Sequence, residues 1–243
     1  MGKNKLERFA ENKTFDFLFQ PRPHDMHKHD FYLKGKWNSH FFKNDNPTVL
    51  EVGCGKGEYT TGMAQIFPNK NFIGIDYKGA RLWRGCKTTE ENNLSNVAFI
   101  RNKIEFINSF FAEDEISEIW ITFPDPQIKK DKKKLTSKRF LNNYKSILQT
   151  DGKAILKTDS VHLFDFTQKI IKLNNIPLIF ASKDIYGEKQ SERCYNIQTF
   201  YEKQFLAEDK KISLTEFRLE KNKLYINPPR IVRTKQKPRN KNV

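Results

Sequence analysis

An acidic residue and three glycines stand together at the end of a short apolar run near residue 50. The segment reads Val49-Leu50-Glu51-Val52-Gly53-Cys54-Gly55-Lys56-Gly57-Glu58, with three glycines at alternate positions after Glu51. Glycine lets a backbone turn sharply and lets a ligand approach closely, because no Cβ stands in the way. Helical periodicity follows the glycines, so the segment predicts a strand, a tight turn and a helix. That arrangement is typical of loops that bind nucleotide-like ligands.

The glycine spacing and the nearby acids narrow the class of ligand. The dinucleotide fingerprint needs a third glycine where Glu58 stands, and the Lys-Ser/Thr ending of a P-loop is missing. Glu51 and Asp76, which follows the next apolar run, instead offer carboxylates to hydroxyl and ammonium groups. Such groups occur on a ligand with a ribose, an adenine and an amino-acid tail. The spacing resembles the S-adenosylmethionine loop of class I methyltransferases, and the alternative is a glycine-rich turn with a cap.

A second candidate carboxylate, Asp125, stands between two prolines in the segment Thr122-Phe123-Pro124-Asp125-Pro126. The segment ends an apolar run over 118–123. In an open α/β sheet ligands bind beyond the carboxyl ends of the strands, so Asp125 is expected beside the reactive end of a cofactor. The alternative is an ordinary proline turn in which the aspartate is a local hydrogen-bond acceptor. The residues alone leave both interpretations open.

The chain carries far more positive than negative charge. Its formal net charge is +15 and its pI is near 9.6, which suits a polyanionic partner, with nucleic acid as the first candidate. Seven basic residues lie between Lys129 and Arg139. On the rim of a catalytic face they can neutralise phosphates around a base presented for reaction. Alone, such a run is as readily a solvated loop.

Together these motifs resemble the bacterial tRNA (guanine-N7-)-methyltransferases, which modify the guanine at position 46 of the tRNA variable loop. Phe123-Pro124-Asp125-Pro126 and Lys129 follow Leu50-Glu51-Val52-Gly53 in the family's order. Lys157-Thr158-Asp159 resembles the family's Thr-Asp motif, and Thr199-Phe200-Tyr201-Glu202 its Thr-x-x-Glu motif. Each of the last two has a structural alternative, because Asp159 could be a helix N-cap and Thr199 with Glu202 has the spacing of a capping box.

The resemblance implies S-adenosylmethionine as cofactor, with S-adenosylhomocysteine as product and no metal, and tRNA as partner. The purine product of such a reaction is cationic, which makes Asp125 the candidate catalytic residue: it could stabilise that charge and could also accept hydrogen bonds from the guanine or from the cofactor's ammonium group. The expected cofactor-binding residues are Glu51, Gly53, Gly55, Asp76, Asn102 and Asp125. The expected substrate-binding residues are Lys129, Asp159, Thr199, Phe200, Tyr201 and Glu202. Two positions depart from the family pattern: most members have tryptophan where Gln127 stands, and many have an acidic residue near Asn102-Lys103.

Alternating apolar and helical segments predict the elements that position these residues. Apolar runs without polar alternation indicate strands buried on both faces, as in a parallel sheet. We therefore expect a doubly wound α/β domain with seven mostly parallel strands and an antiparallel last strand, and the resemblance implies the Rossmann-like fold of the class I methyltransferases. Strands are expected at 49–52, 71–75, 97–101, 118–123, 153–158, 176–181 and 211–219. Helices are expected at 57–67, 79–92, 103–111, 137–149, 160–173 and 199–208. Gly152 is expected to end the helix at 137–149.

The ends of the chain are expected to lie outside this domain, which we place at 46–226. Residues 1–45 are basic and broken by Pro21 and Pro23, so we expect an extension that adds nothing to the core, apart from a short helix at Trp37, Phe41 and Phe42 packed on the sheet edge. His24, His27 and His29 lack the partners of a metal site and suit solvent or phosphate. The basic tail 227–243 is expected to be disordered.

Three classes of function remain on these observations: this tRNA methyltransferase, a class I methyltransferase acting on another RNA or on a small molecule, and a non-catalytic RNA-binding module on the same fold. The basic loop argues against a small substrate, and the acids Glu51, Asp76 and Asp125 argue against loss of catalysis. No apolar run approaches the roughly 18 residues of a membrane span, and the N-terminus leads into charged sequence. We therefore expect a cytoplasmic protein without a membrane partner, whose three widely spaced cysteines are reduced thiols.

Overall fold

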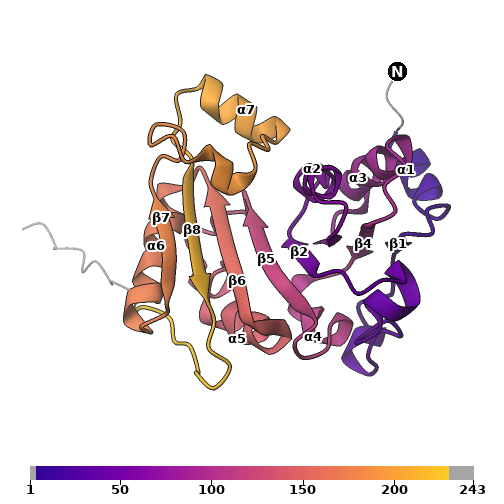
Figure 1. Cartoon of the computed structure of the whole chain (residues 1–243), viewed down its shortest axis with the longest axis horizontal. Helices are drawn as coiled ribbons and strands as arrows, with labels where there is room; N and C mark the ends of the chain where they lie inside the picture. Colours follow the sequence, from indigo (N-terminus) through magenta and orange to yellow (C-terminus); the bar gives the residue numbers. More distant parts are fainter. Residues whose placement is uncertain (1–3, 230–243) are drawn as a thin grey trace, which may run out of the picture.

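A single sheet with helices on both faces makes up the computed structural model, which describes residues 4–229 (Figure 1). Its strand order is β1-β4-β3-β2-β5-β6-β8-β7. The predicted doubly wound sheet is confirmed, with eight strands in place of seven. The additional strand is β1 (Leu18–Phe19), which pairs in parallel with β4 at the edge. Two residues are too few to leave a periodic pattern in the sequence.

Five parallel strands form the middle of the sheet, and the predicted antiparallel strand is confirmed. The parallel strands are β2 (Thr48–Val52), β3 (Asn71–Asp76), β4 (Val97–Arg101), β5 (Ile116–Thr122) and β6 (Leu148–Thr158). The strand β8 (Ser213–Arg218) runs antiparallel between β6 and β7 (Leu178–Ser182). In Figure 1 the arrowheads of β5 and β6 point to one end of the molecule and that of β8 to the other. The carboxyl ends of the parallel strands therefore share one edge.

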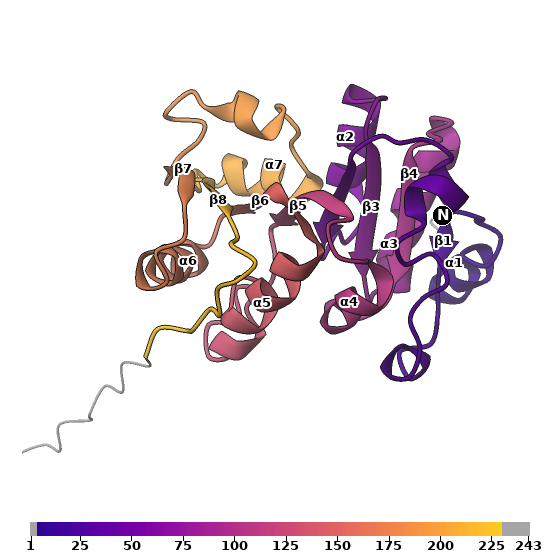
Figure 2. The same cartoon turned by 60° about the horizontal axis from the view of Figure 1, so that its bottom comes forward.

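Helices cover both faces of the sheet, and the apolar periodicity predicts all of them except the first. They are α1 (Lys5–Glu11), α2 (Glu58–Ile66), α3 (Gly79–Glu91), α4 (Ile107–Phe110), α5 (Lys138–Ile147), α6 (Val161–Leu173) and α7 (Phe200–Ala207). Short turns of helix lie at Asp25–His27, Ile104–Phe106, Asp131–Lys133 and Ser191–Cys194, and a π-helix at Trp37–Phe42. One buried cluster unites α4, α5 and α6 with their face of the sheet, and another unites α2 and α3 with the opposite face (Figure 2).

Gly152 does not end the helix that precedes it, contrary to the prediction. The helix α5 ends at Ile147 and β6 begins at the next residue, so Gly152 lies inside the strand. A Cβ at Gly152 would come within 2.9 Å of the Gln149 carbonyl oxygen and 3.1 Å of that of Ser117. Close approach of neighbouring backbones, rather than a helix cap, requires glycine here.

The N-terminal segment belongs to the core, which corrects the expectation that residues 1–45 add nothing to it. Before the π-helix, five apolar side chains are buried: Phe15, Leu18, Met26, Phe31 and Leu33. The short helix at Trp37 is confirmed, and its indole nitrogen donates to the Phe110 carbonyl oxygen at 2.9 Å. The aromatic residues come from mostly irregular stretches of chain and pack on one another as well as on α4, as Phe31 does on Phe19 and Phe110, so they follow no helical or strand period. Asn4-x-x-Glu7 forms a capping box that marks the start of α1 and could have revealed it.

Two further findings concern the described residues only. Within residues 4–229 no helix has the length and apolar character needed to cross a bilayer. In the same range no cluster of three or more His, Cys, Asp and Glu side chains is arranged to hold a metal ion. The expectation for the tail concerns residues that, from 230 onward, lie outside the described part of the chain.

Candidate active site

The glycine loop connects β2 to α2 in a conformation that needs glycine. Gly53, Gly55 and Gly57 have φ of 75°, 58° and 68°, in the left-handed region that other residues rarely adopt. A Cβ at Gly57 would also lie 2.7 Å from the Phe99 ring. The loop is tied to β3, because the Gly53 amide donates to the Ile75 carbonyl oxygen at 2.8 Å. The strand, tight turn and helix predicted for this segment are confirmed.

Glu51 lies within β2, just before the loop, and only 2% of it is exposed. Its carboxylate accepts hydrogen bonds from the Thr60 amide at 2.9 Å, from the Thr60 hydroxyl and from the Thr122 hydroxyl. Burial raises the pKa of Glu51 from its ordinary value of 4.5 to about 7, although these three hydrogen bonds act in the opposite direction. A carboxylate has about four acceptor positions, so Glu51 keeps about one for a ligand.

Asp76 is the last residue of β3, and its side chain binds the glycine loop on the side opposite Glu51. Its carboxylate accepts from the Gly55 amide at 3.0 Å and from the Lys78 amide at 2.7 Å. Asp76 thus fixes the turn after β2 and the start of α3 together. Like Glu51, it serves the architecture of the loop while facing the space above it.

Two adjoining cavities lie above the loop at the carboxyl ends of the strands, and we call them together the cleft. Gly53, Arg81 and Phe123 line both. The first, of about 80 Å³, is also lined by Glu51, Gly55, Glu58, Tyr59, Thr122, Thr199 and Tyr201. The second, of about 230 Å³, is also lined by Asp76, Lys78, Pro124, Asp125, Gln127, Lys133 and Leu135. Seven of the predicted site residues therefore line one cleft: Glu51, Gly53, Gly55, Asp76, Asp125, Thr199 and Tyr201.

Asp125 projects from the loop after β5 and is exposed. Its carboxylate accepts from the Gln127 amide at 3.0 Å, and Phe123 and Gln127 both have a φ of 46°. The aspartate is thus the local acceptor that a proline turn favours. It also shares a cavity with Asp76. The two sequence interpretations, turn residue and cleft residue, are compatible.

Asn102 and Asp159 do not line either cavity. The buried amide of Asn102 donates to the Pro21 carbonyl oxygen at 3.0 Å and accepts from the Lys103 amide at 2.8 Å. Asp159 follows β6 and is half-buried, but the N-cap of α6 is Ser160, whose hydroxyl accepts from the Leu163 amide. The N-cap alternative for Asp159 is therefore wrong.

The segment Thr199–Glu202 forms the capping box that its spacing suggests. Thr199 accepts from the Glu202 amide and the Glu202 carboxylate accepts from the Thr199 amide, each at 3.3 Å. Glu202 is fully buried and points away from the cleft into an ion pair with Lys157 at 2.8 Å. Tyr186 donates to the same carboxylate at 2.7 Å. Burial, and then its bond to Glu202, raises the pKa of Tyr186, so this phenol remains a donor.

The amino end of α7 rests on the glycine loop through contacts that sequence reasoning missed. The Phe200 amide donates to the Glu58 carboxylate at 3.3 Å, and the Lys56 ammonium lies 4.3 Å from the centre of the Phe200 ring. Lys157 on β6 holds the chain just before α7, since its ammonium donates to the Ile197 carbonyl oxygen at 2.8 Å. One signal was available: Lys157 stands in an apolar buried strand, where a charge needs a partner.

The basic loop, residues 129–139, is exposed at six of its seven basic side chains. These are Lys129, Lys130, Lys132, Lys133, Lys138 and Arg139. The seventh, Lys134, is fully buried; it pairs with Asp131, donates to the Gln127 carbonyl oxygen at 3.1 Å and lies 4.7 Å from the centre of the Phe166 ring. Lys134 therefore shapes the loop, and Lys133 brings positive charge to the wall of the cleft.

Known proteins include relatives whose sequences are similar to most of this chain. A family model described as a putative methyltransferase matches residues 45–215. A tRNA (guanine-N(7)-)-methyltransferase of Christiangramia forsetii is 50% identical over 222 residues, which cover 90% of this chain and 99% of the relative. The protein of the same name from Bacteroides fragilis is 46% identical over 219 residues, covering 90% of this chain and 87% of the relative.

Solved structures agree on the fold. The 16S rRNA methyltransferase KamB aligns with a TM-score of 0.57 at 11% identity, over 78% of this chain and 92% of that one. A 30S ribosomal A1408 methyltransferase from an uncultured bacterium aligns with a TM-score of 0.53 at 15% identity, over 75% and 92% of the two chains. At such identities the likeness concerns the arrangement of strands and helices alone.

Proposed function

This chain belongs to the family of the tRNA (guanine-N(7)-)-methyltransferases, and on that premise we propose that it transfers a methyl group from S-adenosylmethionine to N7 of guanine 46 in the variable loop of tRNA. The observation that carries the proposal is the relative that is 50% identical over nearly its whole length. The cleft supports it, because acids suited to the cofactor and cations suited to RNA lie on the same edge of the sheet.

The residues of the cleft fit a sulfonium nucleoside. Pockets for ligands of this size span about 300–1,000 Å³, so the cofactor would extend across both cavities over Gly53. Glu51 and Asp76 would accept hydrogen bonds from its hydroxyl or ammonium groups. The Gly53 and Gly55 backbones allow its close approach. Asn102 lies outside the lining of both cavities, so any contact with the adenine would need its present hydrogen bonds to change.

Methyl transfer to guanine N7 does not require a general acid or base from the protein. Guanine N7 has an in-plane lone pair and no proton to lose, so it attacks the methyl carbon in line. When bound, S-adenosylmethionine would supply the methyl group: the N7–carbon bond would form as the sulfur–carbon bond breaks, and sulfur would keep the electron pair in the neutral thioether of S-adenosylhomocysteine. Holding N7 close to the methyl carbon can supply about 7–11 kcal/mol in favourable cases. The methylated purine is cationic, and we propose that Asp125, which lines the cleft, stabilises that charge.

The surroundings of the cleft suit an RNA substrate. The six exposed cations of the basic loop can neutralise phosphates on either side of the target guanine. Lys129 belongs to this set, and Asp159, Thr199, Phe200 and Tyr201 offer polar and aromatic contacts at the same edge of the sheet. Glu202 would act on the substrate only indirectly, by holding Thr199 and Tyr201 in place. A cytoplasmic location would give the protein access to tRNA.

Nucleoside analysis of tRNA by mass spectrometry tests this proposal. We expect N7-methylguanosine at position 46 in tRNA from cells with the protein and its loss when the gene is deleted. Purified protein should restore the modification to unmodified tRNA in the presence of S-adenosylmethionine. Unchanged N7-methylguanosine in the deletion strain, together with no transfer by the purified protein, would leave the small-molecule methyltransferase or the non-catalytic RNA-binding module.

A further inference from the structure

A basic hollow lies beside the cleft, between the N-terminal segment and the ends of β3 and β4. It consists of a part of about 500 Å³ and an adjoining part of about 170 Å³, which share Gln20 and Arg101. We call it the N-terminal groove. Among the described residues its lining has no carboxylate, but it has three cations, Lys13, Arg22 and Arg101, and the aromatic rings of Phe9 and Tyr77. Cations with interleaved aromatic rings are typical of surfaces that follow a nucleic-acid backbone.

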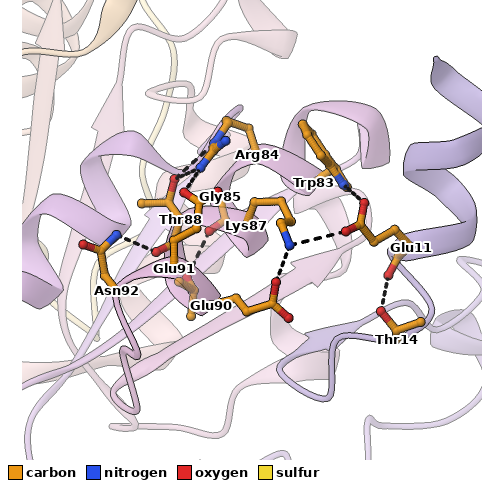
Figure 3. Close-up of polar contacts among 11 residues, drawn as sticks. Glu11, Thr14, Trp83, Arg84, Gly85, Lys87, Thr88, Glu90, Glu91 and Asn92 are labelled. Carbon is orange, nitrogen blue, oxygen red and sulfur yellow. Dashed lines mark hydrogen bonds and ion pairs between the residues drawn. The ribbon is translucent and has the colours of Figure 1, made fainter. Parts of the chain in front are cut away.

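Contacts between α1 and α3 hold one wall of the groove in place (Figure 3). Glu11 accepts a hydrogen bond from the Trp83 indole nitrogen at 2.6 Å and pairs with Lys87 at 3.4 Å. Asn12 donates to the Gly79 carbonyl oxygen at 2.8 Å. Because this wall is already fixed, a ligand would not have to order it on binding.

Two cations of the groove, Arg101 and Lys13, are available to bind an anion. The Arg101 guanidinium lies 4.7 Å from the centre of the Phe9 ring and donates to the Gln20 side-chain oxygen at 3.3 Å. In residues 4–229 neither Arg101 nor Lys13 forms an ion pair with a carboxylate, whereas Arg22 pairs with Asp25 at 3.0 Å. A guanidinium has five N–H donors in a planar fork that matches a phosphate, so Arg101 retains donors for an anion.

The groove continues from the cleft. Arg101 is the partner of Asp76 in the pairing of β3 with β4, and Tyr77, which lines the groove, directly follows Asp76. Asn102 joins the two, because its backbone amide donates to the Asp76 carbonyl oxygen and its side chain holds Pro21. The basic loop lies beyond β5, on the opposite side of the cleft. An RNA strand that enters the cleft from the basic loop would leave it along this groove.

We propose that the N-terminal groove binds the sugar-phosphate backbone of the RNA substrate, with Lys13 and Arg101 each neutralising one phosphate. The exposed ring of Tyr77 provides a face on which a neighbouring base stacks. This inference rests on the proposed function and adds a second contact with the same RNA. It also gives Asn102 a role, as the residue that joins the groove to the cleft.

Equilibrium binding of unmodified tRNA to the full-length protein at several salt concentrations tests the proposal. Each phosphate neutralised contributes about 0.7–0.9 to the slope of log K against log salt concentration. Lys13→Gln and Arg101→Gln should each lower the magnitude of this slope by about one, and the double variant by about two. Lys172→Gln changes an exposed lysine of α6 on the other side of the sheet and serves as the matched control.

A salt slope in both single variants equal to that of the native protein and of Lys172→Gln overturns the proposal. Binding of S-adenosylhomocysteine and thermal unfolding, measured on the same variants, reveal any loss of fold. Lys13 is exposed, so its variant keeps the test decisive even if Arg101→Gln loosens the packing on Phe9. A failure of the proposed function would look different, because the native protein would then transfer no methyl group to tRNA. If only the groove is wrong, native methylation persists while the slopes stay equal.

Discussion

Glu51 carries a carboxyl group at a position that water hardly reaches. Burial raises its pKa to about 7, and its three hydrogen bonds only partly oppose that effect. Between pH 4.5 and 7 the folded protein therefore binds a proton at Glu51 that the unfolded chain has released. The stability that this proton confers is fully present below pH 4.5 and is lost as the pH rises through 7. At one pKa unit per about 1.4 kcal/mol, the loss approaches about 3 kcal/mol.

Replacing Glu51 by glutamine should remove this pH dependence. The native protein is expected to lose up to about 3 kcal/mol of unfolding free energy between pH 4.5 and pH 8 relative to Glu51→Gln. Urea unfolding at closely spaced pH values measures the difference. Glu192→Gln, at an exposed residue, should follow the native curve throughout. Parallel curves for native protein and Glu51→Gln would mean that Glu51 has the same pKa in the folded and unfolded states.

Asp125 is expected to act through its charge, since the transferred methyl group leaves the purine cationic. The variant Asp125→Asn keeps the shape of the turn but loses the negative charge, so single-turnover methylation should fall about 10²–10³-fold. Binding of tRNA should hardly change, because phosphates dominate its affinity. Rapid quench with saturating protein and S-adenosylmethionine measures the rate. Asp151→Asn, an exposed aspartate near the opposite end of β6, is the matched control. A native rate in Asp125→Asn would reduce Asp125 to a turn residue.

Among the elements, α7 depends most on a single buried contact. Lys157 on β6 and Glu202 on α7 are both fully buried and pair at 2.8 Å. The pair holds the capping box of α7, and therefore Thr199 and Tyr201, at the wall of the cleft. The short helix has no other buried side chain, since Glu202 is the one buried residue among its eight.

Breaking this pair should cost more than replacing it. Lys157→Met leaves a buried carboxylate without a cation and should lower the unfolding free energy by about 3–5 kcal/mol. The double variant Lys157→Met with Glu202→Leu should recover part of that loss, because it removes the unpaired buried charge but leaves Tyr186 and the Thr199 amide without their acceptor. Urea denaturation at pH 7 compares the variants. If the double variant is as unstable as the single, the unpaired carboxylate is not the cause.

At the same scale, the sequence predicted the elements better than the residues that anchor them. Strands and helices of the central sheet follow apolar periods, which survive in the sequence because each element buries one continuous face. Glu51, Asp76 and Asp125 could be found because each stands at or near the end of such a run. Lys134 and Glu202 could not be placed, since only the fold decides whether a charge faces solvent or a buried partner. The buried residues between 15 and 33 come from mostly irregular stretches of chain, so their burial left no period to detect.

The whole molecule gathers opposite charges on one edge of the sheet. Acidic Glu51, Asp76 and Asp125 line the cleft, while cations flank it in the basic loop and in the N-terminal groove. Under the proposed function this separation would give the two charges different roles: the acids would bind the cofactor and stabilise the cationic product, and the cations would hold the RNA backbone. The net charge of +15 then favours capture of RNA at low ionic strength.

Removing charge from the basic loop should weaken RNA binding without disturbing the loop, provided that Lys134 is kept. In the triple variant Lys130→Ala, Lys132→Ala and Lys133→Ala, the magnitude of the salt slope for tRNA binding should fall by about two, since each phosphate contact contributes about 0.7–0.9. Lys134→Ala should instead lower the unfolding temperature, because it removes a buried ammonium from its contacts with Asp131 and the Gln127 carbonyl oxygen. Fluorescence anisotropy with labelled tRNA at several salt concentrations measures the slopes. A native slope in the triple variant would show that the exposed lysines face only solvent, and it would leave the N-terminal groove as the main site of phosphate contact.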